Sequence, residues 1–123
     1  MKVVSFDLAK KLKEKGFREK VNAYYGKHEN IFDVHPALDM NDACYRCSAP
    51  TISQVLKWLR EEKEIHISVD ITSAGWINNI VIKVKYVEDG PYWYSKQYRE
   101  TEFYNSYEEA IIEAIEYVLD NLI

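Results

Sequence analysis

The clearest periodicity in the chain covers residues 51–64, where apolar positions recur with helical spacing. One helix face would carry Ile52, Val55, Leu56 and Leu59. Thr51 and Gln54 have the form of a capping box, in which each side chain bonds the backbone N–H of the other residue. We therefore predict an amphipathic helix that begins after Thr51 and packs this face on a core, with Trp58 beside it.

Directly after this helix, apolar and polar residues alternate along the chain. Residues 65–72 and 80–86 alternate with a period of two, which is typical of strands with one buried face. Residues 73–75 and 89–91 have the composition of turns, and residues 92–104 predict a weaker, tyrosine-rich third strand. Turns this short make consecutive strands antiparallel.

Helices are also predicted at both ends of the chain. Ser5 can cap a first helix with the apolar residues Leu8, Ala9 and Leu12, which Gly16 ends. A second capping box, Ser106 with Glu109, opens a last helix. The predicted buried face of that helix comprises Tyr107, Ala110, Ile111, Ala114, Ile115, Val118 and Leu122.

Residues 21–25 and 31–35 predict a hairpin, and residues 36–50 a long loop without periodicity. The resulting order, α-β-β-α-β-β-β-α, predicts an α+β fold: an antiparallel sheet of three or more strands with helices packed on one face. A length of 123 residues fits a single domain, residues 1–123. Within it we expect an α-β-β-β-α core over 46–123, and an N-terminal helix, hairpin and loop over 1–45.

Composition and charge narrow the class of protein. A composition of 47% apolar and 29% charged residues indicates a globular protein, and no window approaches the roughly 20 apolar residues of a membrane span. The only two cysteines stand three residues apart, which does not suggest a secreted disulfide scaffold, so we expect a cytoplasmic protein.

The net charge of −4 is unevenly distributed along the chain. Residues 1–20 hold seven Lys and Arg against three acids, whereas residues 106–123 hold five acids and no base. The end helices can therefore attract each other, within one molecule or between two. The alternative, which we favour, is that both are solvated helix faces whose charges contribute little.

Two kinds of chemical site can be drawn from the side chains. His28, His35, Cys44 and Cys47 are ligand types that zinc accepts, but only the Cys pair has a zinc-like spacing, and ordinary loop residues are the alternative. We expect no metal and no cofactor. Catalytic pairs such as His66 with Asp70, or Cys44 with His35, lack any supporting motif, so we expect no enzyme activity.

Nucleic acid is not an expected partner either. The order α-β-β-β-α is also that of a double-stranded-RNA-binding domain, which needs lysines where the last helix begins. This chain has Glu108 and Glu109 there. Nucleic acid could still bind through the lysine-rich first helix, which carries Lys10, Lys11, Lys13 and Lys15.

Aromatic residues are concentrated near the predicted third strand. They offer either an interaction surface or ordinary cross-strand packing. The candidate interaction residues are Tyr92, Trp93, Tyr94, Tyr98 and Tyr104.

Three segments carry a resemblance to a known group. The run from Ser48 to Glu61, the opening from Ser5 to Phe17, and Tyr107 to Ala110 resemble small uncharacterised proteins from phages and mobile elements of gut anaerobic bacteria. The resemblance implies an accessory role in a bacterial cell and carries no activity. Our leading hypothesis is a non-enzymatic module that binds another protein or itself, without a membrane role. The alternative is a nucleic-acid-associated regulator that uses the basic first helix.

Overall fold

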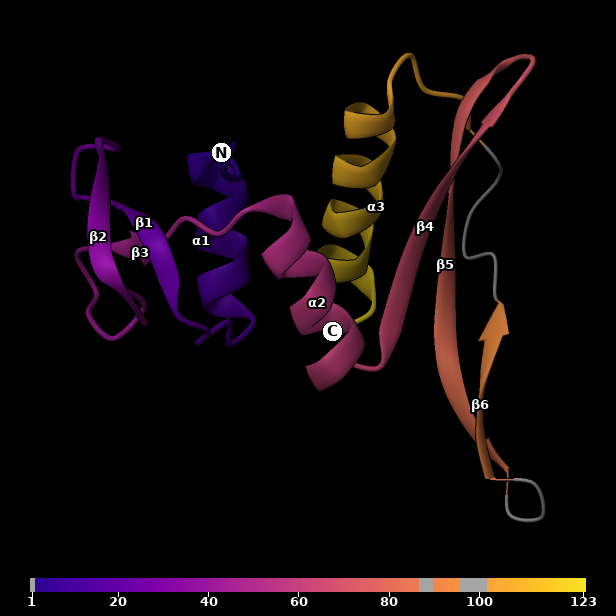
Figure 1. The fold of residues 1–123 in the computed structure, drawn as a ribbon, viewed down its shortest axis with the longest axis horizontal. Helices are drawn as coiled ribbons and strands as arrows, with labels where there is room; N and C mark the ends of the chain where they lie inside the picture. Colours follow the sequence, from indigo (N-terminus) through magenta and orange to yellow (C-terminus); the bar gives the residue numbers. More distant parts are fainter. Residues whose placement is uncertain (1, 87–89, 96–101) are drawn as a thin grey trace. The chain divides into compact units, whose positions relative to one another are not determined.

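The computed structural model describes residues 2–86, 90–95 and 102–123, and it divides the chain into two compact units, 1–58 and 59–123 (Figure 1). Each unit has its own three-stranded antiparallel sheet, so the predicted α+β class is confirmed. The boundary falls inside helix α2 (Ile52–Glu62). A single domain over residues 1–123 stays a prediction.

The N-terminal unit contains α1 (Phe6–Glu14), β1 (Val21–Tyr25), β2 (Ile31–Leu38) and β3 (Cys47–Ser48), and its strand order is β2-β1-β3. The last three residues of β2 and all of β3 lie in the segment predicted as a loop, so that prediction is wrong in part. β3 pairs with β1 through only two residues, at Tyr24↔Ser48 and Tyr25↔Cys47. A strand this short leaves no periodic pattern in the sequence.

Helix α1 forms as predicted. The Ser5 hydroxyl accepts a 3.3 Å hydrogen bond from the backbone N–H of Leu8, and Leu8, Ala9 and Leu12 are buried. Gly16 follows the helix with φ of 88°, a left-handed conformation that glycine adopts without steric cost. The capped start and the glycine stop together fix the length of α1.

Helix α2 begins with the predicted capping box. The backbone N–H of Gln54 donates to Thr51 Oγ1 at 3.2 Å, and the N–H of Thr51 donates to Gln54 Oε1 at 2.8 Å. Trp58 is buried, with its ring centroid 5.3 Å from that of Phe17. Trp58 therefore belongs to the packed face, whereas it was expected beside it.

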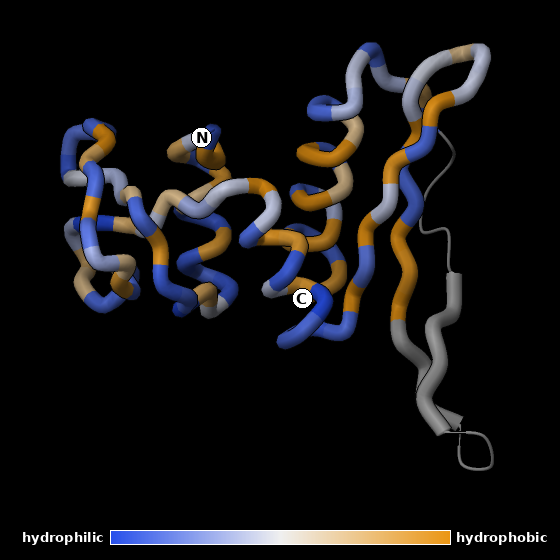
Figure 2. Tube along the Cα trace, viewed as in Figure 1, coloured by the Kyte–Doolittle hydropathy of each residue, from blue (hydrophilic) through white to orange (hydrophobic). Residues whose placement is uncertain are grey.

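The C-terminal unit contains β4 (Ile65–Thr72), β5 (Gly75–Tyr86) and β6 (Gly90–Ser95), in the order β4-β5-β6. Figure 2 shows apolar and polar residues alternating along β4. β5 begins at Gly75, five positions before the predicted start, and pairs with β4 from Thr72↔Gly75 to Ile65↔Ile82. The sequence Trp76-Ile77-Asn78-Asn79 does not alternate, and for this reason its pattern hides the first part of the strand.

Helix α3 (Tyr107–Asn121) packs against β4 and β5, and the Asn78 side chain donates to the carbonyl of Ala110 at 3.0 Å. Ser106 caps the helix by accepting a 3.1 Å hydrogen bond from the N–H of Glu109. Two members of the predicted buried face are wrong: Tyr107 is 49% exposed, and Leu122 lies beyond the last helical residue and is only half-buried. The buried residues are Ala110, Ile111, Ala114, Ile115, Val118 and Leu119.

None of the helices in the described part of the chain has the length and apolar character that a membrane crossing requires.

Candidate functional site

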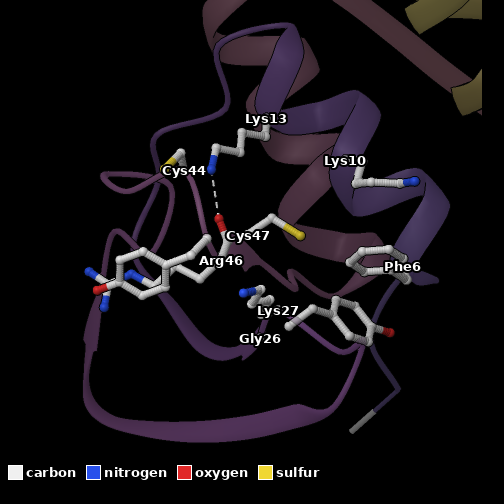
Figure 3. Close-up of a pocket in the computed structure, with 10 residues that line it drawn as sticks. Phe6, Lys10, Lys13, Gly26, Lys27, Cys44, Arg46 and Cys47 are labelled. Carbon is white, nitrogen blue, oxygen red and sulfur yellow. Dashed lines mark hydrogen bonds between the residues drawn. The ribbon is translucent and has the colours of Figure 1, made fainter.

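A cleft of about 190 Å³ opens in the N-terminal unit between α1, the end of β1 and the segment that leads into β3 (Figure 3). Four of its lining residues are positively charged and none is a carboxylate. The lining consists of Phe6, Lys10, Lys13, Tyr25, Gly26, Lys27, Cys44, Tyr45, Arg46 and Cys47.

Helix α1 supplies one wall of the cleft. Phe6, Lys10 and Lys13 are spaced i, i+4 and i+7, so they share one face of the helix. Lys11 and Lys15, which the sequence grouped with them, do not line the cleft. The spacing of Phe6, Lys10 and Lys13 was the signal that sequence reasoning missed.

Lys13 joins this wall to the opposite one. Its Nζ donates to the backbone carbonyls of Ala43 and Arg46, the latter at 2.7 Å and drawn as a dashed line in Figure 3. These carbonyls carry no net charge, so the bonds hold the 43–46 segment against α1 without placing a negative charge beside Lys13.

Arg46 forms the opposite wall. Its guanidinium pairs with Asp42, and this hydrogen bond is the main reason that the pKa of the Asp42 carboxyl lies below its usual value. The guanidinium carbon also lies 5.5 Å from the centroid of the Tyr45 ring. Nε of Arg46 is buried and has no hydrogen-bond acceptor among the described residues. An unsatisfied buried donor is energetically costly.

The two remaining cations are exposed at the cleft. Lys10 Nζ lies 3.6 Å from Asp7 and 4.8 Å from the Phe6 ring centroid, and in Figure 3 it points away from Cys47. Lys27 has no hydrogen bond or ion pair with any described residue. Once Asp7 and Asp42 are counted against their partners, the cleft still holds the uncompensated charges of Lys13 and Lys27.

An aromatic pair lines the other side. The rings of Phe6 and Tyr25 meet edge to face with centroids 5.4 Å apart, and the Tyr25 hydroxyl donates to the carbonyl of Val4 at 2.7 Å. Burial, and to a smaller extent the neighbouring Cys47, raises the pKa of Tyr25. The phenol is therefore neutral at physiological pH and adds no negative charge to the cleft.

The two cysteines are free thiols in different surroundings. Cys44 is exposed, whereas Cys47 is buried and its pKa is raised by that burial. Figure 3 shows their side chains pointing away from each other.

The structure does not assemble the zinc ligands that the sequence suggested. Within the described residues, no group of three or more His, Cys, Asp and Glu side chains could hold a metal ion, and this covers His28, His35, Cys44 and Cys47. His35 instead lies with Nδ1 3.5 Å from the side-chain nitrogen of Asn22.

The candidate catalytic pair on β4 is not assembled either. His66 and Asp70 are four positions apart along the strand, which separates their backbones by about 13 Å, beyond hydrogen-bonding reach.

The predicted aromatic interaction surface is only partly visible. Tyr104 is 7% exposed and exchanges two backbone hydrogen bonds with Trp76, so it belongs to the interior of its unit, contrary to the prediction. The side chains of Tyr92, Trp93 and Tyr94, and all of Tyr98, lie outside the described residues. As an interaction surface, these four residues stay a prediction.

The division into units changes the meaning of the net charge. Residues 1–58 contain ten Lys and Arg against seven Asp and Glu, a net charge of +3, and residues 59–123 contain six against thirteen, a net charge of −7. The overall charge of −4 therefore comes from the C-terminal unit. The cleft lies in the N-terminal unit, whose net charge is positive.

Comparison of the chain with protein-family profiles, with curated protein sequences and with solved structures gave no match. The function must therefore be argued from the cleft itself, which combines fixed positive charge with aromatic rings.

Proposed function

We propose that this protein is a non-enzymatic accessory module that binds nucleic acid through the cleft of its N-terminal unit. The observation that carries the proposal is the set of four cations, Lys10, Lys13, Lys27 and Arg46, in a lining without a carboxylate. Phosphate oxygens are the anions that such a set attracts, and the contacts release counterions from the nucleic acid. The accessory role in a bacterial cytoplasm, during replication of a phage or mobile element, is part of this proposal.

The test is fluorescence anisotropy with labelled oligonucleotides at different salt concentrations. If two to four phosphates are contacted, affinity for a single strand falls roughly 7- to 50-fold between about 50 and about 200 mM salt. The double variant Lys10→Glu/Lys27→Glu reverses two exposed cleft charges and is expected to abolish binding.

A matched control separates the cleft from general charge. Lys20 and Lys57 are exposed residues of the same unit that do not line the cleft, so Lys20→Glu/Lys57→Glu makes the same change in net charge elsewhere. Binding in this control is expected to persist. Equal loss in both variants, or no binding by the wild type at low salt, contradicts the proposal.

A second candidate function, binding of a protein partner or self-association, is favoured by a separate observation in the C-terminal unit. Three large apolar residues, Ile71, Phe103 and Tyr107, are exposed there. Ile71 pairs with Trp76, whose ring lies 5.8 Å from that of Tyr107, so these side chains share one region. Exposed apolar groups of this kind often mark contact surfaces.

Sedimentation equilibrium tests the self-association form of this candidate. Ile71→Ser/Phe103→Ser is expected to shift an associating protein towards the monomer. A wild type that is monomeric at all concentrations removes self-association and leaves a different protein as the partner.

A further inference from the structure

Tyr45 presents an aromatic ring to solvent beside the basic cleft. It is 60% exposed, although it stands between the exposed Cys44 and the anchored Arg46. The Arg46 guanidinium lies over the ring, 5.5 Å from its centroid, and the Lys13 bonds to the carbonyls of Ala43 and Arg46 hold the backbone on both sides. The ring is thus open to a ligand, and the backbone on both sides of it is held in place.

We infer that the ligand of the cleft is a single-stranded nucleic acid, with a base stacked on Tyr45 and an adjacent phosphate held by the cleft cations. The inference rests on the proposed function and adds the form of nucleic acid. Aromatic rings and arginine planes are the groups on which unpaired bases stack. In a duplex the base faces are covered by neighbouring bases, so they cannot reach such a ring.

The size of the cleft agrees with this assignment. A volume of about 190 Å³ is below the about 300 Å³ at which pockets for drug-sized molecules begin. The cleft has room for one phosphate held by its cations, and the base stacked on the exposed Tyr45 ring lies outside it. A longer strand would continue over the exposed surface.

The cations are suitably arranged for the phosphate. Lys27 is exposed and has no protein partner among the described residues. Its ammonium gains a partner when a phosphate oxygen arrives, whereas an uncharged ligand would leave its charge uncompensated. The free phosphate group, a phosphopeptide and a nucleotide share this chemistry, and the stacked base is what distinguishes the nucleic acid.

The test measures anisotropy of a labelled single strand and its matched duplex with three variants. Tyr45→Ala is expected to weaken single-strand binding by about 5- to 150-fold, the effect of losing one stacked base. Tyr45→Phe keeps the ring and is expected to bind within about twofold of the wild type. Phe103→Ala removes a similarly exposed aromatic residue of the C-terminal unit (54% against 60%) and is expected to leave single-strand binding unchanged.

The outcomes separate this inference from the proposed function. If Lys10→Glu/Lys27→Glu abolishes binding but Tyr45→Ala does not weaken it, or if duplex binds as tightly as single strand, the stacked-strand inference is overturned and nucleic-acid binding stands. If a phosphopeptide displaces the strand more readily than unlabelled strand does, the ligand is a protein segment and both are overturned. Circular dichroism melts of each variant confirm that the fold is intact.

Discussion

The side chain of Asn41 donates a 2.7 Å hydrogen bond to the backbone carbonyl of Phe17, the residue that follows the stop of α1. Its Oδ1 accepts a 2.8 Å hydrogen bond from the N–H of Ser48, and the Ser48 hydroxyl in turn accepts from the N–H of Met40. Asn41 is only 6% exposed, so these bonds lie in surroundings where water cannot replace them. They tie both ends of the segment that carries Tyr45 and Arg46 to the body of the unit.

Replacing Asn41 with leucine is expected to lower the free energy of unfolding by about 2–4 kcal/mol, because the Phe17 carbonyl and the Ser48 N–H are left buried without partners. Urea denaturation measures the change. Asn22→Leu is the control, since Asn22 is exposed and its 3.1 Å bond to the Val34 carbonyl can be replaced by water; we expect a loss below about 1 kcal/mol. Similar losses in both variants would show that the Asn41 bonds do not anchor the segment.

Gly75 is expected to tolerate no side chain. Its φ is 136°, and a Cβ would lie 2.9 Å from the backbone oxygen of Tyr104, which cannot move without breaking the Trp76–Tyr104 bonds. Gly75→Ala should therefore destabilise the protein by about 2 kcal/mol or more. Gly16→Ala is the control. Gly16 also has a positive φ, but no atom lies within 4 Å of the position its Cβ would take, so the thermal stability of this variant should fall less than that of Gly75→Ala. Equal losses would mean that backbone strain alone decides both.

The sequence was sufficient for elements whose determinants are local. Ser5, Thr51 and Ser106 were recognised as helix starts because a capping residue and its N–H partner are three positions apart. The alternation of apolar and polar residues was sufficient to predict β4. It could not predict the first residues of β5, which do not alternate and are held as a strand by β4 and Tyr104 in other segments of the chain.

The wall of the cleft opposite α1 depends on contacts that no local pattern records. Lys27 and Arg46 line the same cleft as Lys13 because the two-residue strand β3 pairs with β1, and a pairing this short has no sequence signature. The proximity of Cys44 and Cys47 in sequence was misleading for the opposite reason. Cys44 lies in the turn before β3 and is exposed, whereas Cys47 is the first residue of β3 and is buried.

The Asp42–Arg46 pair predicts a gain of function. Asp42→Asn removes the carboxylate that neutralises Arg46, so the cleft gains one effective positive charge. We expect tighter binding of a single strand, by a few-fold, and a steeper salt dependence by about 0.7 in the logarithmic slope. Asp33→Asn makes the same charge change on β2, away from the cleft lining, and should gain less. The same gain in both would assign the effect to net charge.

The same pair predicts a titration shift. Because its hydrogen bond to Arg46 lowers the pKa of Asp42, the pair is intact above the unfolded-state pKa of that carboxyl and is lost as pH falls through the lowered folded value. At neutral pH it is therefore fully formed. Arg46→Met is expected to raise the Asp42 pKa towards its ordinary value, measured by carbon-detected NMR of the carboxyl resonance. If the titration midpoint of the Asp42 carboxyl were unchanged in this variant, Arg46 would not be the group that lowers its pKa.

Thiol labelling tests the site and its ligand together. Cys44 is exposed and lines the cleft, whereas Cys47 is buried and its raised pKa leaves little thiolate to react. A maleimide reagent should thus label the protein in two phases, and Cys44→Ser should remove the fast one. Saturation with a single strand is expected to slow the fast phase, because the bound strand covers Cys44. If the strand binds and the fast phase keeps its rate, the ligand lies elsewhere on the protein and the cleft is not its site.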